Sequence, residues 1–402
     1  MKTIAVIGGG AAGMMAALTA AEMPGNRVIL FERQQRLGRK LLATGNGRCN
    51  LTNTGAGVKN YHGADAAFAE YALAAFPPEA VRAFFRSLGL LTVEEYGGRV
   101  YPLSNSANSV LDVLRLALDA GGVEQRCGES VRALRRGGGG FVLAADGGEL
   151  AADRVIVACG GCAGATLGGV KDGYELLKTL GHARTALHPA LVQLTTAPDY
   201  PRALKGVRVQ SELRLMRGAE TLAESRGELQ FTEKGVSGPA VFDLSRAAAT
   251  EGGTLSLHAA LLPLAESEIL ALLRARKSAQ PTLAASDMLT GMLHNRLGRM
   301  LVKYAGLPAN KPLSELTEKE LRGVAGACRD FTLPVTGTEG FDHAQVTAGG
   351  VQTAGFDPRT LESRLVPGLF ACGEVLDIDG DCGGYNLQWA WASGRLAGRL
   401  GT

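Results

Sequence analysis

Residues 3–13 of the chain read TIAVIGGGAAG, and this stretch decides the fold. The apolar run at its start predicts a buried strand, and the glycines that follow predict a tight turn into a helix over residues 13–23. A second apolar run, RVILFE at residues 27–32, predicts another buried strand. A strand, a glycine-rich turn, a helix and a second strand within about thirty residues form the unit that opens a doubly wound sheet. We therefore predict an α/β fold with a Rossmann-like first domain.

The glycine-rich turn has the spacing of a dinucleotide-binding fingerprint. Gly8 permits the tight turn, Gly10 lets a pyrophosphate approach the backbone, and Gly13 lets the helix pack close to the sheet. Glu32 ends the second predicted strand, where a carboxylate can accept hydrogen bonds from ribose hydroxyls. An acidic residue there favours a ribose without a 2′-phosphate, and hence FAD or NAD over NADP. A chance glycine cluster in a core turn is the alternative.

A second bare helix start lies near the end of the chain, in the sequence DCGGYNLQWAWASG at residues 381–394. A predicted strand ending in Gly373 and Glu374 precedes it, and in FAD enzymes of this topology the acidic residue there reaches the ribityl chain. Gly383 and Gly384 strip the helix start of side chains, so its N–H groups can face the N1/C2=O edge of a flavin. The two bare helix starts, one near each end of the chain, thus predict a single long ligand that both of them contact. This prediction favours FAD.

Length and composition describe a globular protein of two or three domains. The chain has 402 residues, of which 46% are hydrophobic and 20% charged. A net charge of +3 gives no electrostatic case for nucleic acid or a membrane surface as a partner. Seven cysteines, an odd number, do not suggest a disulfide framework. We expect a cytoplasmic monomer or small homo-oligomer without a signal peptide or membrane span, acting on a small-molecule substrate.

The order of the predicted elements divides the chain into three parts. Short alternating strands with glycine turns at residues 123–158 predict a β-meander of the GR2 type that returns to the parallel sheet. Residues 190–260 then read mostly as strands, and residues 264–330 mostly as helices. The predicted parts are an FAD-binding domain at 1–188 and 344–402, an inserted β domain at 189–262 and 331–343, and a small helical subdomain at 263–330.

Six motifs give the sequence a family resemblance. They are VIGGGAAG (6–13), GRKLLATGNGRCNLTN (38–53), GRVYP (98–102), GVSGPAVFDLS (235–245), VTAGGV (346–351) and GLFACGEVLDIDGDCGGYNLQWAWASG (368–394). With them the sequence resembles the HI0933-like (BaiN/YhiN-type) family of FAD-dependent oxidoreductases, a branch of the two-dinucleotide-binding flavoproteins. The resemblance covers essentially the whole chain. It implies a Rossmann-like FAD domain that carries an inserted β domain and a helical piece.

The loop ATGNGRCNLTN at residues 43–53 is a third predicted contact with the cofactor. Its glycines allow the backbone to press against a flat ligand, while Arg48 and Asn50 offer donors for phosphate, ribityl or flavin carbonyl oxygens. The resemblance implies that this loop lies at the flavin, and a polar turn remains the alternative from the residues alone. The predicted cofactor-binding residues are Gly8, Gly10, Ala11, Ala12, Gly13, Glu32, Arg33, Arg39, Lys40, Leu41, Gly45, Asn46, Gly47, Arg48, Asn50, Gly160, Gly161, Gly373, Glu374, Gly383, Gly384, Tyr385 and Asn386.

No single proton donor stands out in the sequence. Thr347, in VTAGGV, resembles the Thr-x-Gly-Gly turn of fumarate-reductase-like flavoproteins, where the turn lies near substrate and flavin; a plain strand-end turn is the alternative. The candidate proton donors near the flavin are His343, Tyr385, Arg329 and Tyr101, and the catalytic candidates retained are Thr347, His343 and Tyr385.

The cysteines are predicted to pack rather than react. ACGGC at residues 158–162 has the spacing of a redox pair, but dithiol flavoenzymes place larger residues between their cysteines. Cys159 and Cys162 are therefore expected to be small packing residues. The spacing of His, Cys and Asp residues matches no metal site, so no metal is predicted.

The fingerprint and the resemblance together predict an FAD-dependent oxidoreductase of the reductase type. The chain has no second strand–GxGxxG–helix pattern and so lacks a separate nicotinamide domain; NAD(P)H is expected as a transient reductant. Hydride would pass from flavin N5 to an activated, enone-type C=C bond of a small organic molecule. The alternatives are an oxidase of small amines, a flavin-dependent RNA-modifying factor, against which the small net charge counts, and a non-catalytic flavin-binding protein.

Overall fold

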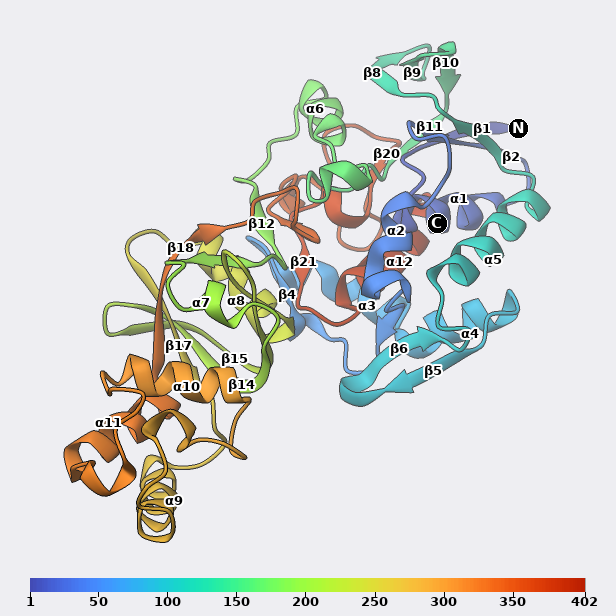
Figure 1. Ribbon diagram of the computed structural model, residues 1–402. Helices are drawn as coiled ribbons and strands as arrows, with labels where there is room; N and C mark the ends of the chain where they lie inside the picture. Colours follow the sequence, from blue (N-terminus) through green and yellow to red (C-terminus); the bar gives the residue numbers. More distant parts are fainter. Residues whose placement is uncertain (402) are drawn as a thin grey trace. The chain divides into compact units, whose positions relative to one another are not determined.

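The computed structural model describes residues 1–401, which fall into two compact units (Figure 1). The first unit comprises residues 1–189 together with the segment that begins at Phe341, and the second comprises residues 190–340. The chain leaves the first unit once and returns once, so the second unit is an insertion. Within the described residues, no helix combines the length and the hydropathy needed to cross a membrane.

A five-stranded parallel sheet forms the frame of the first unit. Its strands lie in the order β20-β11-β1-β2-β7, and each neighbouring pair is parallel. The carboxyl ends of parallel strands share one edge of a sheet, which is where such sheets bind their ligands. The strands are β1 (Lys2–Ile7), β2 (Asn26–Glu32), β7 (Glu124–Cys127), β11 (Arg154–Val157) and β20 (Leu369–Ala371).

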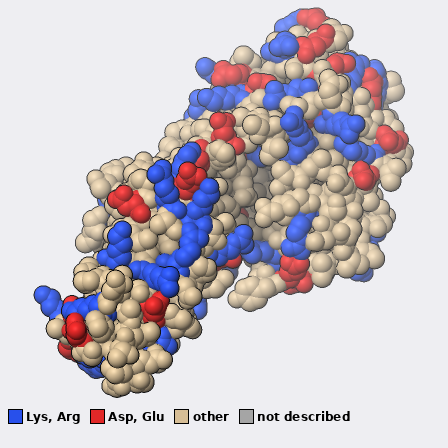
Figure 2. Space-filling view, in the orientation of Figure 1, with Lys and Arg blue, Asp and Glu red and all other residues tan. Residues whose placement is uncertain are grey.

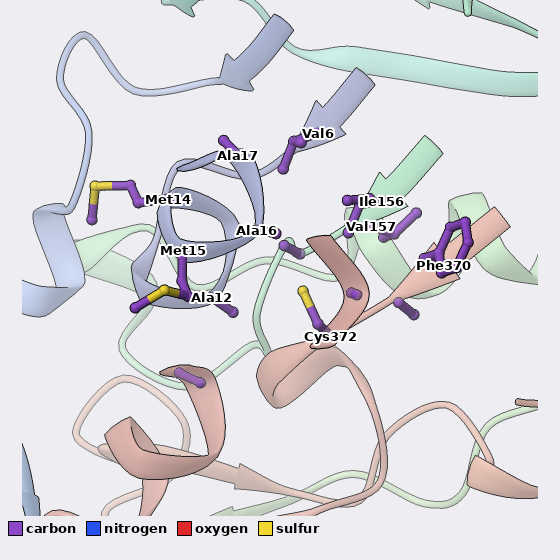
Figure 3. Close-up of a cluster of buried hydrophobic side chains, with 14 of the residues drawn as sticks. Val6, Ala12, Met14, Met15, Ala16, Ala17, Ile156, Val157, Phe370 and Cys372 are labelled. Atoms are coloured by element: carbon purple, nitrogen blue, oxygen red, sulfur yellow. The ribbon is translucent and has the colours of Figure 1, made fainter. Parts of the chain in front are cut away.

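Two helices pack on each other beside this sheet, and the first of them contacts its strands. Helix α1 (Ala11–Ala21) follows β1 and packs along α12 (Tyr385–Gly398). Gly394 and Gly398 of α12 permit the close approach, because a side chain at either would overlap Ala12 or Thr19 of α1. Figure 3 shows side chains of β1, α1, β11 and the β20 region meeting in this core. Helix α1 begins at Ala11, two residues before the predicted start at residue 13, because the end of the glycine-rich turn is already helical.

The remaining parts of the first unit confirm the predicted Rossmann-like fold with a β-meander. Strands β8, β9 and β10 form an antiparallel sheet before the chain returns to the parallel sheet at β11. The other elements are α2 (Arg39–Ala43), β3 (Thr52–Asn53), β4 (Tyr61–His62), α3 (Glu70–Ala75), α4 (Pro78–Ser87), β5 (Thr92–Glu95), β6 (Arg99–Pro102), α5 (Ala107–Ala120), β8 (Val131–Gly137), β9 (Gly140–Ala145), β10 (Gly148–Ala152), α6 (Asp172–Thr179), β12 (His188–Ala190), β19 (Val346–Ala348) and β21 (Asp379–Gly380).

The second unit is a closed barrel with helices packed on it. The strand order is β13-β16-β15-β14-β17-β18, and in β17 buried and half-buried residues alternate as the period of a strand requires. The helices share one hydrophobic core with the barrel. The elements are β13 (Leu194–Thr196), α7 (Pro201–Leu204), β14 (Arg208–Arg217), β15 (Glu220–Phe231), β16 (Gly235–Ser237), α8 (Pro239–Thr250), β17 (Leu255–Ala260), α9 (Glu266–Ala279), α10 (Asn295–Tyr304), α11 (Glu318–Arg329) and β18 (Phe331–Thr338).

Two segments of the second unit differ from the sequence-based expectation. Reading residues 190–260 mostly as strands missed helix α8, which Pro239 starts in the first-turn position that suits proline. Its buried residues Ala240, Val241 and Leu244 have helical spacing. The helical pattern over residues 288–306 becomes the shorter α10, because Gly291 adopts a left-handed turn with φ of 84° before it.

Candidate functional site

The turn from β1 into α1 leaves a helix N-terminus uncovered. Gly10 is the N-cap residue, and no side chain caps the helix. The first N–H groups of a helix have no acceptor within it, so they can bind an anion such as a pyrophosphate. A side chain at Gly8 would overlap the carbonyl oxygen of Ala158, and one at Gly13 would overlap that of Gly8. A Cβ at Gly10 would meet nothing within 4 Å, so the space in front of the helix is open there.

Glu32 lies at the end of β2 and ties two loops together. Its Oε2 accepts a hydrogen bond from the Gly9 N–H at 2.9 Å, and its Oε1 accepts one from the Gln34 N–H at 2.7 Å. A carboxylate oxygen can accept more than one hydrogen bond, so Glu32 keeps lone pairs for a ribose hydroxyl. Arg33 follows Glu32 and is exposed, as is Arg39 at the start of α2, which donates to the Gln34 side chain at 3.0 Å.

We expect Glu32→Ala to weaken FAD binding by about 1.5–3 kcal/mol, the size of a hydrogen bond to a charged group. Loss of the Gly9 contact would add to this effect, because the glycine turn would lose an anchor. Titration of the apo-protein with FAD measures the change. Glu124→Ala is the control, since Glu124 begins β7 opposite Ile29, three residues before Glu32 in the register of the two strands. An unchanged dissociation constant in Glu32→Ala would contradict the ribose assignment.

Four segments that are distant in sequence meet beside the Gly160–Gly161 turn. Glu374 accepts hydrogen bonds from the Thr347 N–H at Oε1 and from Lys40 Nζ at Oε2, both at 2.8 Å. Any side chain at Gly161 would overlap Thr347 and would lie 2.7 Å from Glu374 Oε1. The structure therefore brings the predicted residues Lys40, Gly160, Gly161 and Glu374 together at one place. Leu41 is 3% exposed and packs in the core.

The N-terminus of α12 is bare in the same way as that of α1. Gly384 is its N-cap residue, with φ of 100° and no side-chain cap. A Cβ there would lie 2.5 Å from the carbonyl oxygen of Thr52 and 2.8 Å from Asn50 Oδ1. Asn53 Nδ2 donates to the carbonyl oxygen of Gly383 at 3.0 Å, and Trp391 Nε1 donates to that of Leu51 at 2.8 Å. The loop predicted to lie at the flavin is thus fixed against the helix start.

The backbone of this loop is held in an unusual conformation. Gly45, Asn46 and Gly47 have φ values of 57°, 56° and 84°, and Cys49 has φ of 62°. Left-handed residues in succession suit glycine and asparagine, which explains the sequence GNG. Asn50 is 9% exposed, and its Oδ1 is buried without a hydrogen-bond partner. A buried acceptor without a donor suits a site whose ligand supplies the missing N–H or O–H, so the residues present fit a bound flavin.

The donor role predicted for Arg48 does not agree with its position. The guanidinium of Arg48 pairs with Glu95, donates to Asn105 and stacks 4.0 Å from the centre of the Tyr101 ring. Its hydrogen bond to Glu95 raises the pKa of Arg48, which is the expected effect of a paired carboxylate. Arg48 is therefore engaged with the β5–β6 hairpin, and only its backbone belongs to the loop.

Arg99, which the sequence did not single out as a site residue, lies at the turn that leads into α12. Its Nε lies 3.4 Å from where a Cβ at Gly383 would be, next to Asn53 Nδ2 at 3.6 Å from the same point. Among residues 1–401 no carboxylate forms an ion pair with Arg99. A signal was present in the motif GRVYP, but the sequence could not show which end of the ligand the motif approaches.

Tyr385 and Asn386 shape the turn that leads into α12. Asn386 Oδ1 accepts from the Gly380 N–H at 2.8 Å, and Nδ2 donates to the Gly380 carbonyl oxygen at 2.7 Å. The carbonyl oxygen of Tyr385 accepts from the Tyr61 hydroxyl at 2.9 Å, and the two rings meet edge to face at 6.4 Å. Burial raises the pKa of Tyr61, so this hydroxyl stays protonated as a donor.

The three catalytic candidates lie before β19, in β19 and at the start of α12. Thr347 is 1% exposed, and its Oγ1 accepts from the Ala163 N–H at 2.9 Å, so this hydroxyl has a structural bond. His343 is exposed in the segment before β19, whereas Tyr385 begins α12. Arg329 belongs to the second unit, where it donates to the Leu262 carbonyl oxygen at 3.1 Å. No group of three His, Cys, Asp or Glu within residues 1–401 is placed to hold a metal ion.

The two cysteines of ACGGC lie in surroundings that suppress thiol reactivity. Burial, helped by the charges of Asp172 and Glu32, raises the pKa of Cys159 to about 12. Burial also raises the pKa of Cys162. Because the thiolate is the reactive form, both shifts lower the reactivity of these thiols at neutral pH, which supports packing over redox chemistry.

We expect Cys159 to resist iodoacetamide at pH 8 in the native protein and to react in urea. With a pKa of about 12, its thiolate fraction at pH 8 is about one in ten thousand. Unfolding removes the burial that raises the pKa, so labelling should accelerate strongly. Mass spectrometry of tryptic peptides reads the result. Fast native labelling, or a Cys159–Cys162 disulfide in protein purified in air, would contradict the structural role.

The parallel sheet, the β-meander and the two bare helix starts define a Rossmann-like FAD-binding flavoprotein. Residues 2–400 match the family described as HI0933-like protein Rossmann domain, and the chain belongs to this family. The structure and this match confirm the predicted family, fold class and enzyme class: the protein is an FAD-dependent oxidoreductase.

The chain is similar to two relatives along nearly its whole length and, in fold, to a solved structure. The chain is 42% identical over 404 residues to a 3-dehydro-bile acid Δ(4,6)-reductase of Clostridium scindens, covering 99% of this chain and 98% of that protein. It is 32% identical over 391 residues to a ribosomal RNA dihydrouridine synthase of Escherichia coli, covering 96% and 95%. The solved 3-ketosteroid Δ1-dehydrogenase of Sterolibacterium denitrificans matches with a TM-score of 0.50 over 99% of both chains. At 12% identity the last likeness shows the fold alone.

Proposed function

We propose that the protein reduces a C=C bond conjugated with a carbonyl group in a small organic substrate, with NAD(P)H as the electron donor. One observation carries this proposal: the 42% identity along nearly the whole length of a reductase. The name of that relative specifies double bonds at positions 4 and 6 of an acid with a 3-oxo group. A conjugated carbonyl makes such a bond a hydride acceptor, because the carbonyl oxygen takes up the negative charge.

The site supports this proposal through what it can hold. FAD, when bound, supplies the hydride chemistry. The residues of this chain would bind and orient it: the α1 N-terminus would face the pyrophosphate, and Glu32 would accept from the ribose. The Glu374 carboxylate, which Lys40 holds in place, would accept from the ribityl chain, and the bare start of α12 would face the ring.

A second substrate class is favoured by a separate observation. Two relatives, 32% and 28% identical over at least 95% of each chain, are named ribosomal RNA dihydrouridine synthases. Forming dihydrouridine from uridine also reduces a C=C bond conjugated with a carbonyl, so the two candidates share one reaction and differ in the molecule that carries the bond.

Helix α10 bears the exposed cations Arg296, Arg299 and Lys303 and no acidic residue. Figure 2 shows Lys and Arg side chains gathered on the second unit.

Anaerobic mixing of the protein with a reductant and then with a substrate distinguishes the two candidate functions. The flavin absorbance of the purified protein should bleach with NADH or NADPH and recover on addition of a 4,6-dien-3-one steroid acid or of cyclohexenone. Mass spectrometry should then find product with two added hydrogen atoms per reduced bond. Recovery only with unmodified ribosomal RNA, together with dihydrouridine in its digest, would select the second candidate. Bleaching by small amines with peroxide formed in air, and none by NAD(P)H, would overturn both in favour of an oxidase.

A further inference from the structure

We propose that Asn50 and Arg99 together recognise the imide edge of the flavin ring, with Asn50 accepting from N3–H and Arg99 donating to the adjacent carbonyl oxygen. This proposal rests on FAD as the cofactor and is independent of which substrate the enzyme reduces. It assigns two side chains to one end of the ring and so fixes how the ring is turned.

The first observation is the unpaired oxygen of Asn50. Its Oδ1 is buried without a partner and lies 2.8 Å from the Cβ position of Gly384, the N-cap of α12. Helix N-termini carry positive partial charge, which favours the oxygen over the amide nitrogen at this place. A buried acceptor left without a donor costs about 1–3 kcal/mol. A ligand N–H directed at Asn50 would remove that cost.

The second observation is the unpaired guanidinium of Arg99. It lies beside Gly383, one residue before the N-cap of α12, and no carboxylate pairs with it in residues 1–401. A guanidinium only donates hydrogen bonds, as do the free N–H groups of a helix start. By contrast, Glu95 already neutralises the nearby Arg48. The helix start therefore presents the unpaired acceptor of Asn50 next to several donors.

The chemistry of this pattern identifies its ligand. An acceptor beside donors is complementary to an N–H group flanked by carbonyl oxygens, which is an imide. FAD contains one imide, at the pyrimidine end of the flavin ring, where C2=O, N3–H and C4=O lie side by side. The pyrophosphate and the ribityl chain have no N–H group. The adenosine end of FAD is assigned to the start of α1 and to Glu32. Arg99 then places positive charge beside the carbonyl edge that becomes electron-rich on reduction, which raises the reduction potential.

A modified flavin tests the Asn50 contact without any substrate. Full-length apo-protein is titrated with FAD and with N3-methyl-FAD, in which the donor hydrogen is replaced by a methyl group. The wild type should bind the methylated flavin about 5- to 100-fold more weakly, the equivalent of one buried group left unpaired. Asn50→Ala should bind FAD more weakly than the wild type does and should lose most of the discrimination. Equal affinity of the wild type for both flavins would overturn the assignment.

The reduction potential tests Arg99. Arg99→Gln, with FAD bound, should have a lower potential than the wild type, and Arg99→Lys should recover most of the difference because it keeps the charge. Arg82→Gln is the matched control, since Arg82 lies on α4 and is paired with Glu94 of β5 at 3.3 Å. Its potential and its FAD affinity should equal those of the wild type. A wild-type potential in Arg99→Gln would overturn the role of Arg99, and circular dichroism verifies that each variant is folded.

Discussion

Gly10→Val should yield a folded, colourless protein whose affinity for FAD is at least about 100-fold lower, a loss of about 2.7 kcal/mol. The backbone of Gly10 is extended with φ of −80°, which any residue can adopt, and a Cβ there meets no protein atom within 4 Å. The protein alone therefore tolerates the side chain at about 1 kcal/mol, for poorer helix capping. The pyrophosphate does not, because the valine would occupy its place before the helix.

Absorbance after purification and FAD titration of the apo-protein measure this effect. Gly10→Ala should give an intermediate loss, since a single methyl group intrudes less. Gly252→Val is the control, because Gly252 lies in a loop of the second unit with nothing within 4 Å of its Cβ position. Gly8→Val is less informative: it would overlap Ala158 and damage the fold directly. Full retention of FAD by Gly10→Val would mean that the pyrophosphate does not bind at α1.

Trp391→Ala should destabilise the first unit by about 3–5 kcal/mol, the usual cost of removing a large buried ring. Trp391 is 0% exposed, and its ring meets that of Phe85 edge to face at 5.2 Å. Its Nε1 also holds the carbonyl oxygen of Leu51, so the loop at the helix start should loosen and FAD should bind more weakly. Urea unfolding, monitored through the release of bound flavin, measures the stability of this unit.

Two variants separate the packing contribution of Trp391 from its hydrogen bond. Trp391→Phe keeps most of the volume and leaves the Leu51 carbonyl oxygen without its donor, at a cost of about 1–3 kcal/mol. Leu116→Ala removes an apolar side chain that is 68% exposed on α5, so its effect should stay within about 0.5 kcal/mol. If Trp391→Ala were no more destabilising than Leu116→Ala, the helix would not anchor the loop.

Substitutions at Gly383 and Gly384 would not separate an effect on flavin binding from an effect on the fold. Gly384 has φ of 100°, and any Cβ there lies 2.5 Å from the Thr52 carbonyl oxygen. Gly383 has room for a side chain but has φ of 138°. Side chains at either position strain the turn itself, so loss of flavin would not show what the helix start contributes. Asn50 and Arg99 are better probes of that place.

Local patterns in the sequence were sufficient to predict the Rossmann-like framework of the first unit. The run TIAVIGGGAAG specifies a strand, a turn and a helix because its period, its glycines and its length act within about ten residues. The pair Gly383–Gly384 likewise marks the start of α12, which the structure confirms. Helix α8 was missed because the short apolar run AVF fits a strand as well as a helix, and only burial on the barrel selects the helix.

The sequence by itself determined that the chain begins with a dinucleotide-binding turn, ends with a second bare helix start, and belongs among FAD-dependent oxidoreductases. Those features are local, since backbone conformation and glycine spacing do not depend on distant residues. Tertiary structure alone decided that Glu95 engages Arg48 while Arg99 stays unpaired at Gly383, and that Lys40, Gly161, Thr347 and Glu374 meet. The reason is that a side chain's partner depends on which segments the fold brings together, and here an ion pair joins Lys40 and Glu374, 334 positions apart.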